Sequence, residues 1–313
     1  MRRFAAAISL ALLACTDPGA SEGGTDSDTE TGYGDGDDGD GDGDGDGDGD
    51  GDGDGEGDGD GETTGGMPEG MSTWTGQFEA NSFTVTVDLT IINTGGDLEV
   101  TMIWTDEGLE GTSYMLTGTH EPGSQLVALA PADWVEAPPA ELELIGLLGS
   151  YDPDSQTLSG TMVDYATGID NVLRGGPASF ELVDGPGEPT TVGDAANGLE
   201  PGARALSGQQ QCSGPVREVA GELDYDGEGG ITGSLTIGGP DVADPLGTFA
   251  VSGVHNPSTG GITLVPGLWE PVNHSILTFF VDGTFEASTG EFNGDIRTNT
   301  NACPPGTWMT SVE

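Results

Sequence analysis

Histidine and cysteine are the scarce side chains in this sequence that could support metal or acid–base chemistry. The chain has three His, namely His120, His255 and His274, and three Cys. Neutral imidazole binds transition metals and transfers protons near neutral pH, and a thiolate is a nucleophile. The sequence contains no His-Glu-x-x-His and no Cys-x-x-Cys, two spacings that assemble such chemistry. Gly-x-Ser-x-Gly occurs once, at 19–23, within the segment predicted below to be a disordered tether. We therefore expect no catalytic residues, no metal site and no cofactor.

Two of the histidines have matching surroundings. His120 is followed by Pro122 and then by Trp134, and His255 is followed by the same residue types at the same spacing, ending at Trp269. These four side chains form a candidate pocket, since a small ligand can bind at the mouth of a β-barrel. The structural alternative, which the sequence favours, is that each His hydrogen-bonds the backbone beside a Pro turn and each Trp belongs to a core.

Acidic pairs suggest a second kind of chemistry. Glu141 and Glu143, or Asp152 and Asp154, could serve a carboxylate-based hydrolase if two of them converged in a cleft. Carboxylates are so abundant here that their proximity along the chain means little. An enzyme is therefore disfavoured.

The N-terminus combines a charged start with a short apolar run. Arg2 and Arg3 precede eleven apolar or small residues, too few to span a bilayer, which needs about 20. The run ends in Leu12-Leu13-Ala14-Cys15, which resembles the lipobox of bacterial lipoproteins. That resemblance implies removal of residues 1–14, lipidation of Cys15 and a membrane anchor, and because Thr16 follows Cys15 it favours the outer membrane.

The remaining cysteines form an even number once Cys15 is lipidated. Cys212 and Cys303 are then expected to pair in an oxidising compartment. The competing interpretation is two buried free thiols.

The charge balance limits the partners. The chain has 55 acidic residues against six Arg and no Lys, and its formal net charge is −49. Phosphate groups would be repelled, so we expect neither nucleic acid nor anionic lipid headgroups as electrostatic partners. A negative surface keeps an exported protein soluble.

Residues 15–72 are predicted to be a disordered tether. From Asp35 to Glu62 the chain is almost purely alternating Gly and Asp, with no apolar side chain to bury. A segment that starts at Asp42 has the first acidic positions of an EF-hand calcium loop. The twelfth position of that loop would be Gly53, where a bidentate acid is required. The tether is thus mainly a spacer, with weak, diffuse binding of divalent cations as the minority alternative.

After the tether the sequence shows the alternation of strands. Phe83, Val85, Val87, Leu89 and Ile91 alternate with polar residues, and a second run from Leu98 to Trp104 continues the pattern after Thr94-Gly95-Gly96-Asp97. This predicts a hairpin. No stretch shows a convincing helical period.

An internal duplication divides the folded region. Five residues recur with a displacement of 135: Gly118, His120, Pro122, Pro131 and Trp134 match Gly253, His255, Pro257, Pro266 and Trp269. Three more recur with a displacement of 134: Gly149, Tyr151 and Gly160 match Gly283, Phe285 and Gly294. Trp74-Thr75-Gly76 is aligned with Cys212-Ser213-Gly214. We therefore expect a first module at 73–184, a linker at 185–211 and a second module at 212–313.

Each module suits an all-β antiparallel meander of seven or eight strands closed into a barrel. The opening Trp74-x-Gly76, the central Leu-Thr-Gly at 116–118 and the closing Ser179-Phe180-Glu181-Leu182 resemble the small eight-stranded barrels of the calycin type. A β-sandwich is the alternative.

These features together predict a non-enzymatic lipoprotein of the cell envelope that presents tandem β modules for binding or structural roles outside the membrane. The alternatives are a calycin-like carrier of a small apolar ligand and, less favoured, the carboxylate-based hydrolase. The sequence identifies neither the ligand nor the protein partner.

Overall fold

The computed structural model describes residues 65–80, 83–137, 144–163, 179–184, 191–211, 216–238, 246–270, 278–297 and 306–312. The predicted signal peptide, Cys15, the Gly-Asp run, Glu141, Glu143, Cys212, His274 and Cys303 lie outside the described residues. Residues from Gly59 onward belong to one compact unit. Among the residues that the structure describes, none forms a helix with the length and apolar character that a bilayer crossing requires.

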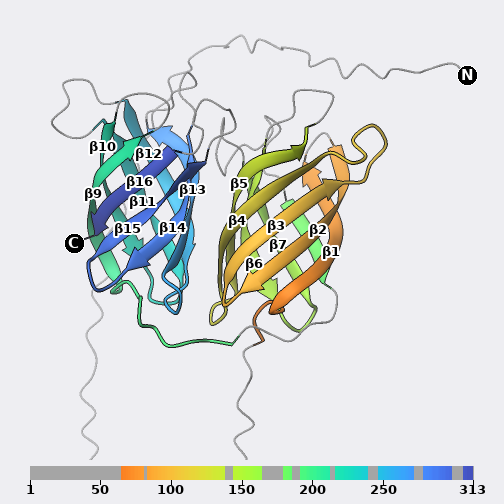
Figure 1. Cartoon of the computed structure of the whole chain (residues 1–313), viewed down its shortest axis with the longest axis horizontal. Helices are drawn as coiled ribbons and strands as arrows, with labels where there is room; N and C mark the ends of the chain where they lie inside the picture. Colours follow the sequence, from red (N-terminus) through yellow and green to blue (C-terminus); the bar gives the residue numbers. More distant parts are fainter. Residues whose placement is uncertain are drawn as a thin grey trace, which may run out of the picture. The chain divides into compact units, whose positions relative to one another are not determined.

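The fold consists of two closed antiparallel barrels of eight strands each (Figure 1). The first barrel runs in sequence order through β1 (Gly70–Ala80), β2 (Phe83–Thr94), β3 (Asp97–Trp104), β4 (Ser113–Glu121), β5 (Leu126–Glu136), β6 (Gly146–Asp152), β7 (Thr157–Val163) and β8 (Ser179–Asp184). Pairing of β1 with β8 closes it. The predicted barrel is therefore confirmed, and the sandwich alternative is wrong.

The second barrel repeats this order. Its strands are β9 (Gly202–Gln211), β10 (Arg217–Tyr225), β11 (Gly230–Ile237), β12 (Gly247–His255), β13 (Gly261–Glu270), β14 (Phe280–Glu286), β15 (Glu291–Arg297) and β16 (Gly306–Val312). Pairing of β9 with β16 closes it. Among the described strands, none of one barrel is inserted into the sheet of the other.

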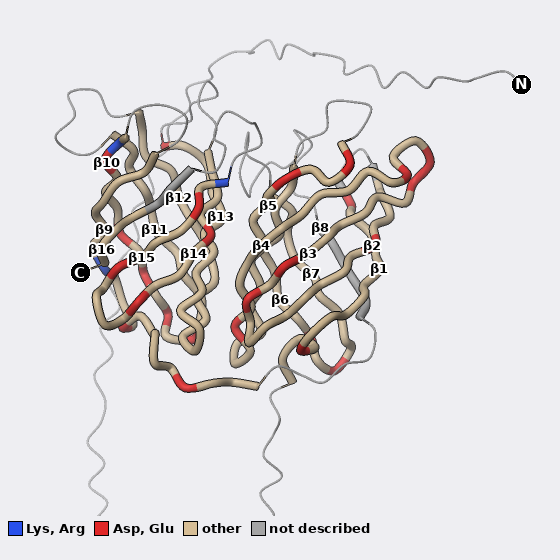
Figure 2. The backbone as a smooth tube through the Cα atoms, viewed as in Figure 1, with Lys and Arg blue, Asp and Glu red and all other residues tan. Residues whose placement is uncertain are grey.

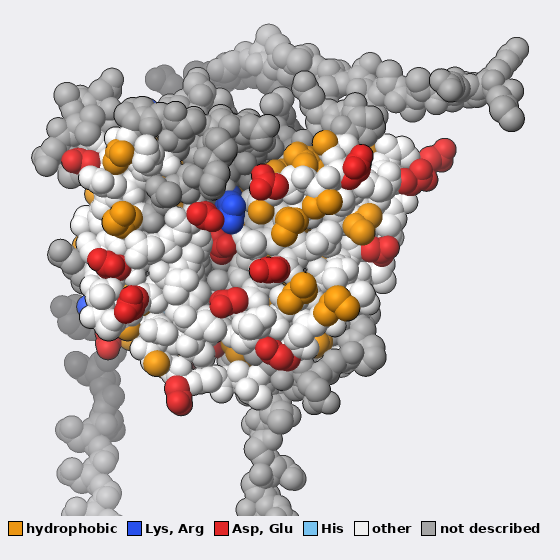
Figure 3. Space-filling view, in the orientation of Figure 1, with side chains coloured by type: hydrophobic (Ala, Val, Ile, Leu, Met, Phe, Trp, Pro, Cys, Tyr) orange, Lys and Arg blue, Asp and Glu red, His pale blue; other side chains and the backbone are white. Residues whose placement is uncertain are grey.

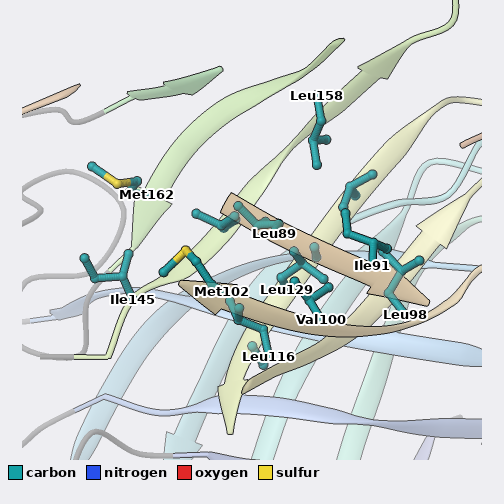
Figure 4. Close-up of a cluster of buried hydrophobic side chains, with 14 of the residues drawn as sticks. Leu89, Ile91, Leu98, Val100, Met102, Leu116, Leu129, Ile145, Leu158 and Met162 are labelled. Carbon is teal, nitrogen blue, oxygen red and sulfur yellow. The ribbon is translucent and has the colours of Figure 1, made fainter. Parts of the chain in front are cut away.

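The predicted hairpin is present. Thr94 pairs with Asp97 across Gly95 and Gly96, whose φ values of 63° and 100° suit a two-residue turn that only Gly adopts without strain. Inward residues of β2 and β3 are buried, and Figure 4 shows Leu89, Ile91, Leu98, Val100 and Met102 among them. The alternation recognised in the sequence therefore places one apolar face inside the barrel.

The duplicated residues occupy equivalent places. Gly149 pairs with Gly160 between β6 and β7, and Gly283 pairs with Gly294 between β14 and β15. A side chain at Gly149 or at Gly283 would overlap the backbone of the neighbouring strand. Both fourth-to-fifth strand pairs also shift register, opposite Pro131 and opposite Pro266. Proline lacks an N–H for the ladder, so it is accommodated at such an irregularity.

Two predicted boundaries are wrong. The predicted linker 185–211 contains β9, and the predicted tether 15–72 contains Met67 and the start of β1. The counterpart of Trp74-Thr75-Gly76 is Leu206-Ser207-Gly208, because Gly76 and Gly208 hold equivalent places against β8 and β16. In β9 only Leu206 and Gln210 are buried, so this strand lacks the apolar alternation by which β2 is recognised.

The proposed disulfide stays a prediction, since neither cysteine is described. Cys212 directly follows Gln211, which pairs with Thr307, and Cys303 precedes that residue by four positions. The described pairing thus brings together the strands next to which the two cysteines occur in the sequence.

Candidate functional site

Each barrel has a buried histidine that joins three parts of the chain. His120 is fully buried; its Nε2 accepts a hydrogen bond from the Met67 N–H (3.1 Å), and its Nδ1 lies 3.1 Å from the Leu126 carbonyl oxygen. Because Nε2 is an acceptor, the proton is on Nδ1, which donates to Leu126. The residue before β1 is thus tied to β4 and to the start of β5.

The second barrel repeats this arrangement. The Leu199 N–H donates to His255 Nε2 (3.1 Å), and His255 Nδ1 donates to the Gly261 carbonyl (3.1 Å). Met67 and Leu199 are both buried, and each is followed three residues later by a glycine with positive φ, Gly70 or Gly202, that begins the first strand. The two imidazoles are therefore structural hydrogen-bonding groups.

Burial keeps both imidazoles neutral. It lowers the pKa of His120 to about 4 against the opposing influence of the bond to Leu126, and it also lowers the pKa of His255. A neutral ring is required, because a protonated Nε2 could not accept the bond from Met67 or Leu199.

The tryptophans lie elsewhere. Trp134 packs edge-on against Tyr114 with ring centroids 5.4 Å apart, and Trp269 packs edge-on against Phe249 at 4.9 Å. Tyr114 is six residues from His120 along β4, about 20 Å at the rise of a strand. The structure therefore does not bring His120 together with Trp134, or His255 with Trp269, and the proposed pockets are not formed by these pairs.

The barrel interiors are filled. Large side chains with almost no exposure occupy them, including Trp74, Phe78 and Tyr114 in the first barrel and Phe249 and Phe292 in the second. Over the described residues, no group of three or more His, Cys, Asp or Glu side chains is placed to hold a metal ion. Asp152, one of the acids considered for hydrolysis, is exposed and accepts hydrogen bonds from Asp154 and Ser155 within its own turn.

The most unusual polar cluster lies where the barrels meet. Asp282, on β14, accepts hydrogen bonds from Thr117 of the first barrel (2.6 Å) and from Thr263 (2.8 Å). The Thr263 hydroxyl uses its proton on Asp282, so it accepts from Thr119 of the first barrel at 2.9 Å. At the rim of the contact Thr259 donates to Asp97 (3.1 Å). These six side chains link the barrels by three hydrogen bonds, two of which are accepted by carboxylates.

The position of Asp282 controls its ionisation. Burial raises the pKa of Asp282; the hydroxyls of Thr117 and Thr263 and the charge of Arg297 oppose this shift, and Asp295 adds to it. Partial burial and repulsion from Asp282 likewise raise the pKa of Asp97, while its bond from Thr259 lowers it. Asp282 carries no distinguishing signal in the sequence, because it is one acid among 55.

Comparisons with known proteins do not identify the chain. No family model matches it, and no curated protein matches it. Among solved structures, a Trp-to-Ala mutant of transferrin binding protein B from Haemophilus parasuis shows 10% identity and a TM-score of 0.25, covering 77% of this chain and 66% of that protein. MucB in complex with MucA shows 12% identity and a TM-score of 0.24, covering 78% and 88% respectively, and the Pseudomonas aeruginosa MucA/MucB complex shows 12% and 0.23, covering 77% and 87%. The chain spans about two thirds of the transferrin binding protein that it matches.

Replacing His120 with Leu should lower the unfolding free energy by about 1–3 kcal/mol at neutral pH, because the buried Met67 N–H loses its acceptor. The histidine pKa is lower in the folded state than in the unfolded state. Its contribution is therefore complete above the unfolded value of 6.5 and is lost as the pH falls through about 4. Denaturant unfolding of wild type and variant across this range should show a deficit that shrinks with acidification. His255→Leu is the matched variant, and a pH-independent deficit in both would contradict the assignment.

Replacing Asp282 with Asn should remove a pH dependence of the unfolding free energy whose sign is opposite to that of the histidines. A raised folded pKa means that wild-type stability is greatest when Asp282 is protonated and falls as the pH rises from 3.8 through the folded pKa. The stability of Asp282→Asn relative to wild type should therefore increase from acid to neutral pH in urea titrations. Asp282→Leu is the control: it also lacks the charge, but it leaves the two threonine hydroxyls without an acceptor and should cost about 1–3 kcal/mol. Parallel wild-type and Asn profiles would refute the expectation.

Proposed function

We propose that this chain is a lipoprotein of the cell envelope, anchored through Cys15, that holds a pair of fused barrels on an acidic tether for binding a partner outside the membrane. The signal sequence and the lipobox resemblance support the anchor, and the Gly-Asp run supports the tether. The filled interiors favour recognition on the outer surface and give no support to a carrier of an apolar ligand.

One surface observation carries the binding role. In the first barrel, β2, β3, β4 and β5 each expose a large apolar side chain: Ile92, Ile103, Met115 and Val135. Figure 3 shows hydrophobic side chains interspersed with acids over these strands. The second barrel has Thr236, Ala250 and Glu270 at the positions equivalent to Ile103, Met115 and Val135. The copies share their interiors but differ on this face, which suggests that the first barrel has a recognition role of its own.

The charge of the surroundings indicates the kind of partner. Acidic residues are spread over strands and turns of both barrels, with Arg at few points (Figure 2). Asp88 and Glu136 lie in register with Ile103 through β2–β3 and β4–β5 pairing. A partner with apolar anchors and a basic rim would match this face in both respects.

The anchor is tested by Cys15→Ser. We expect the variant to move from the membrane fraction to the soluble fraction, because no described segment is suited to hold the chain in a bilayer as a helix. Metabolic labelling with a fatty acid should mark the wild type alone. Membrane partition of the variant equal to that of wild type would overturn the anchoring proposal.

The recognition face is tested by Ile103→Asp/Met115→Asp in the anchored chain. Chemical crosslinking in intact cells should give adducts with the wild type that fall at least about fivefold with this variant, because two apolar anchors are replaced by charges. Met309→Asp is the matched control, since Met309 is 61% exposed on the second barrel and Met115 is 38% exposed. Equal loss of adducts in both variants, or no loss in either, would refute a role for this face.

A further inference from the structure

The two barrels contact each other through equivalent strands. β4 and β5 of the first barrel pack against β12 and β13 of the second, and β14 also contacts β5. By the duplication, β12 corresponds to β4, β13 to β5 and β14 to β6. A contact between like faces is the arrangement of a twofold dimer, in which every pair of residues occurs twice.

Reciprocal contacts confirm this relation at the turns. Asn256 Nδ2 donates to the carbonyl oxygens of Gly95 (2.8 Å) and His120 (3.0 Å), and a side chain at Gly96 would overlap it. Glu121 is the equivalent of Asn256, and it packs in the same way against Gly229, the equivalent of Gly96. The contact is therefore pseudo-twofold.

One pair marks the pseudo-twofold axis. Gly146 begins β6, and its equivalent in β14 is Phe280. A side chain at Gly146 would overlap the Phe280 ring. Phe280 belongs to a strand of the second barrel, yet it is fully buried in the apolar cluster of the first barrel. Two equivalent residues thus face each other, and one has a large aromatic side chain while the other has none.

The hydrogen bonds of the contact are not reciprocal. Thr117 donates to Asp282, but the equivalents of these residues are Ser252 and Leu148. The carboxylate is therefore present on only one side of the axis.

The second hydroxyl pair is also one-sided. Thr119 donates to Thr263, whereas the equivalents of these residues are Val254 and Ala128. Val254 and Ala128 are both buried in the same apolar cluster. The face of the contact is thus polar on one side of the axis and apolar on the other.

These differences disfavour pairing of a barrel with its own kind. Two first barrels would leave a void between two copies of Gly146 and would place the Thr117 and Thr119 hydroxyls against Leu148 and Ala128. Two second barrels would bring two Phe280 rings onto the axis, would place two Asp282 carboxylates in the contact and would set each Thr263 hydroxyl against Val254. Voids, overlaps and unsatisfied buried polar groups each cost stability.

We propose that the faces containing Gly146 and Phe280 form a selective interaction surface, through which a first barrel pairs with a second barrel in preference to another copy of itself. The size complementarity of Gly146 and Phe280 and the one-sided bonds to Asp282 provide the selectivity, by disfavouring the wrong partner as well as stabilising the right one. Neighbouring tethered chains then remain separate molecules, each with its barrels paired internally, and the four exposed apolar side chains of β2–β5 stay accessible.

The test uses the full chain with Cys15→Ser and a protease site inserted within residues 185–190. After cleavage, the two halves are unfolded in urea, refolded by dilution and analysed by native mass spectrometry, which separates the three kinds of pair by mass. Random pairing would give about half of all pairs as like with like. We expect like pairs to be at least about tenfold rarer than that in the wild type.

The variant Phe280→Gly/Asp282→Leu gives the second barrel the residues of the first at both positions. Because both side chains lie on the outside of the second barrel, we expect the barrel to remain closed and like pairs to rise at least about fivefold. Phe292→Leu is the control: it alters a buried Phe of the second-barrel core and should leave the pair distribution unchanged. Random pairing in the wild type, separation of its halves at micromolar concentration, or an unchanged distribution in the double variant would overturn the proposal.

A second measurement on the uncleaved chain does not depend on refolding of separate halves. Light scattering after size exclusion should show the wild type as a monomer at high concentration and the double variant with a dimer fraction at least about fivefold larger. Equal dimer fractions in the two proteins would also overturn the proposal.

Discussion

The closure of each meander onto its own first strand is the constraint on which the other features depend. Pairing of β1 with β8 and of β9 with β16 gives each described strand two neighbours inside its own barrel, so neither sheet has an edge strand. Closure at eight strands leaves an interior that side chains can fill, and here they fill it. In each barrel a neutral imidazole, His120 or His255, then binds the segment that enters the barrel and joins it to two strands. In the first barrel Asn93 adds hydrogen bonds to the carbonyls of Met67 and Pro68. An acid or a metal at this place would not provide one acceptor and one donor in the same ring.

A filled interior moves recognition to the outside. Two outer faces are distinguished by their side chains: the face of β2–β5 in the first barrel, where apolar residues lie among carboxylates, and the face between the barrels, where Asp282 is half-buried. The second face resembles a subunit interface that is contained within one chain. Its apolar part packs around the fully buried Phe280, whereas its polar part depends on hydroxyl groups that come from both barrels.

The two titrating groups respond to pH in opposite directions. The histidines lose their contribution as the pH falls, and Asp282 lowers stability as the pH rises, so the two effects offset each other between acid and neutral pH. Burial shifts the pKa of the histidines and of Asp282. A substitution that changes the burial of one of these groups therefore also changes its pKa.

The sequence by itself determined the all-β class, the hairpin at Gly95-Gly96, the duplication and the equivalence of His120 with His255. These features are local or periodic: alternation of side chains identifies a strand, two consecutive glycines permit the turn, and a constant displacement shows the repeat. The tertiary structure decided what no local pattern contains. It assigned β9 to the second barrel, because that strand is stabilised by pairing with β10 and β16 and has little apolar alternation of its own. It separated His120 from Trp134 along β4, although both recur with the same displacement. It also brought Asp282 to Thr117 and Phe280 to Gly146, and these pairs are set by the packing of two closed barrels against each other, which depends on the shape of whole faces and not on any segment of the chain.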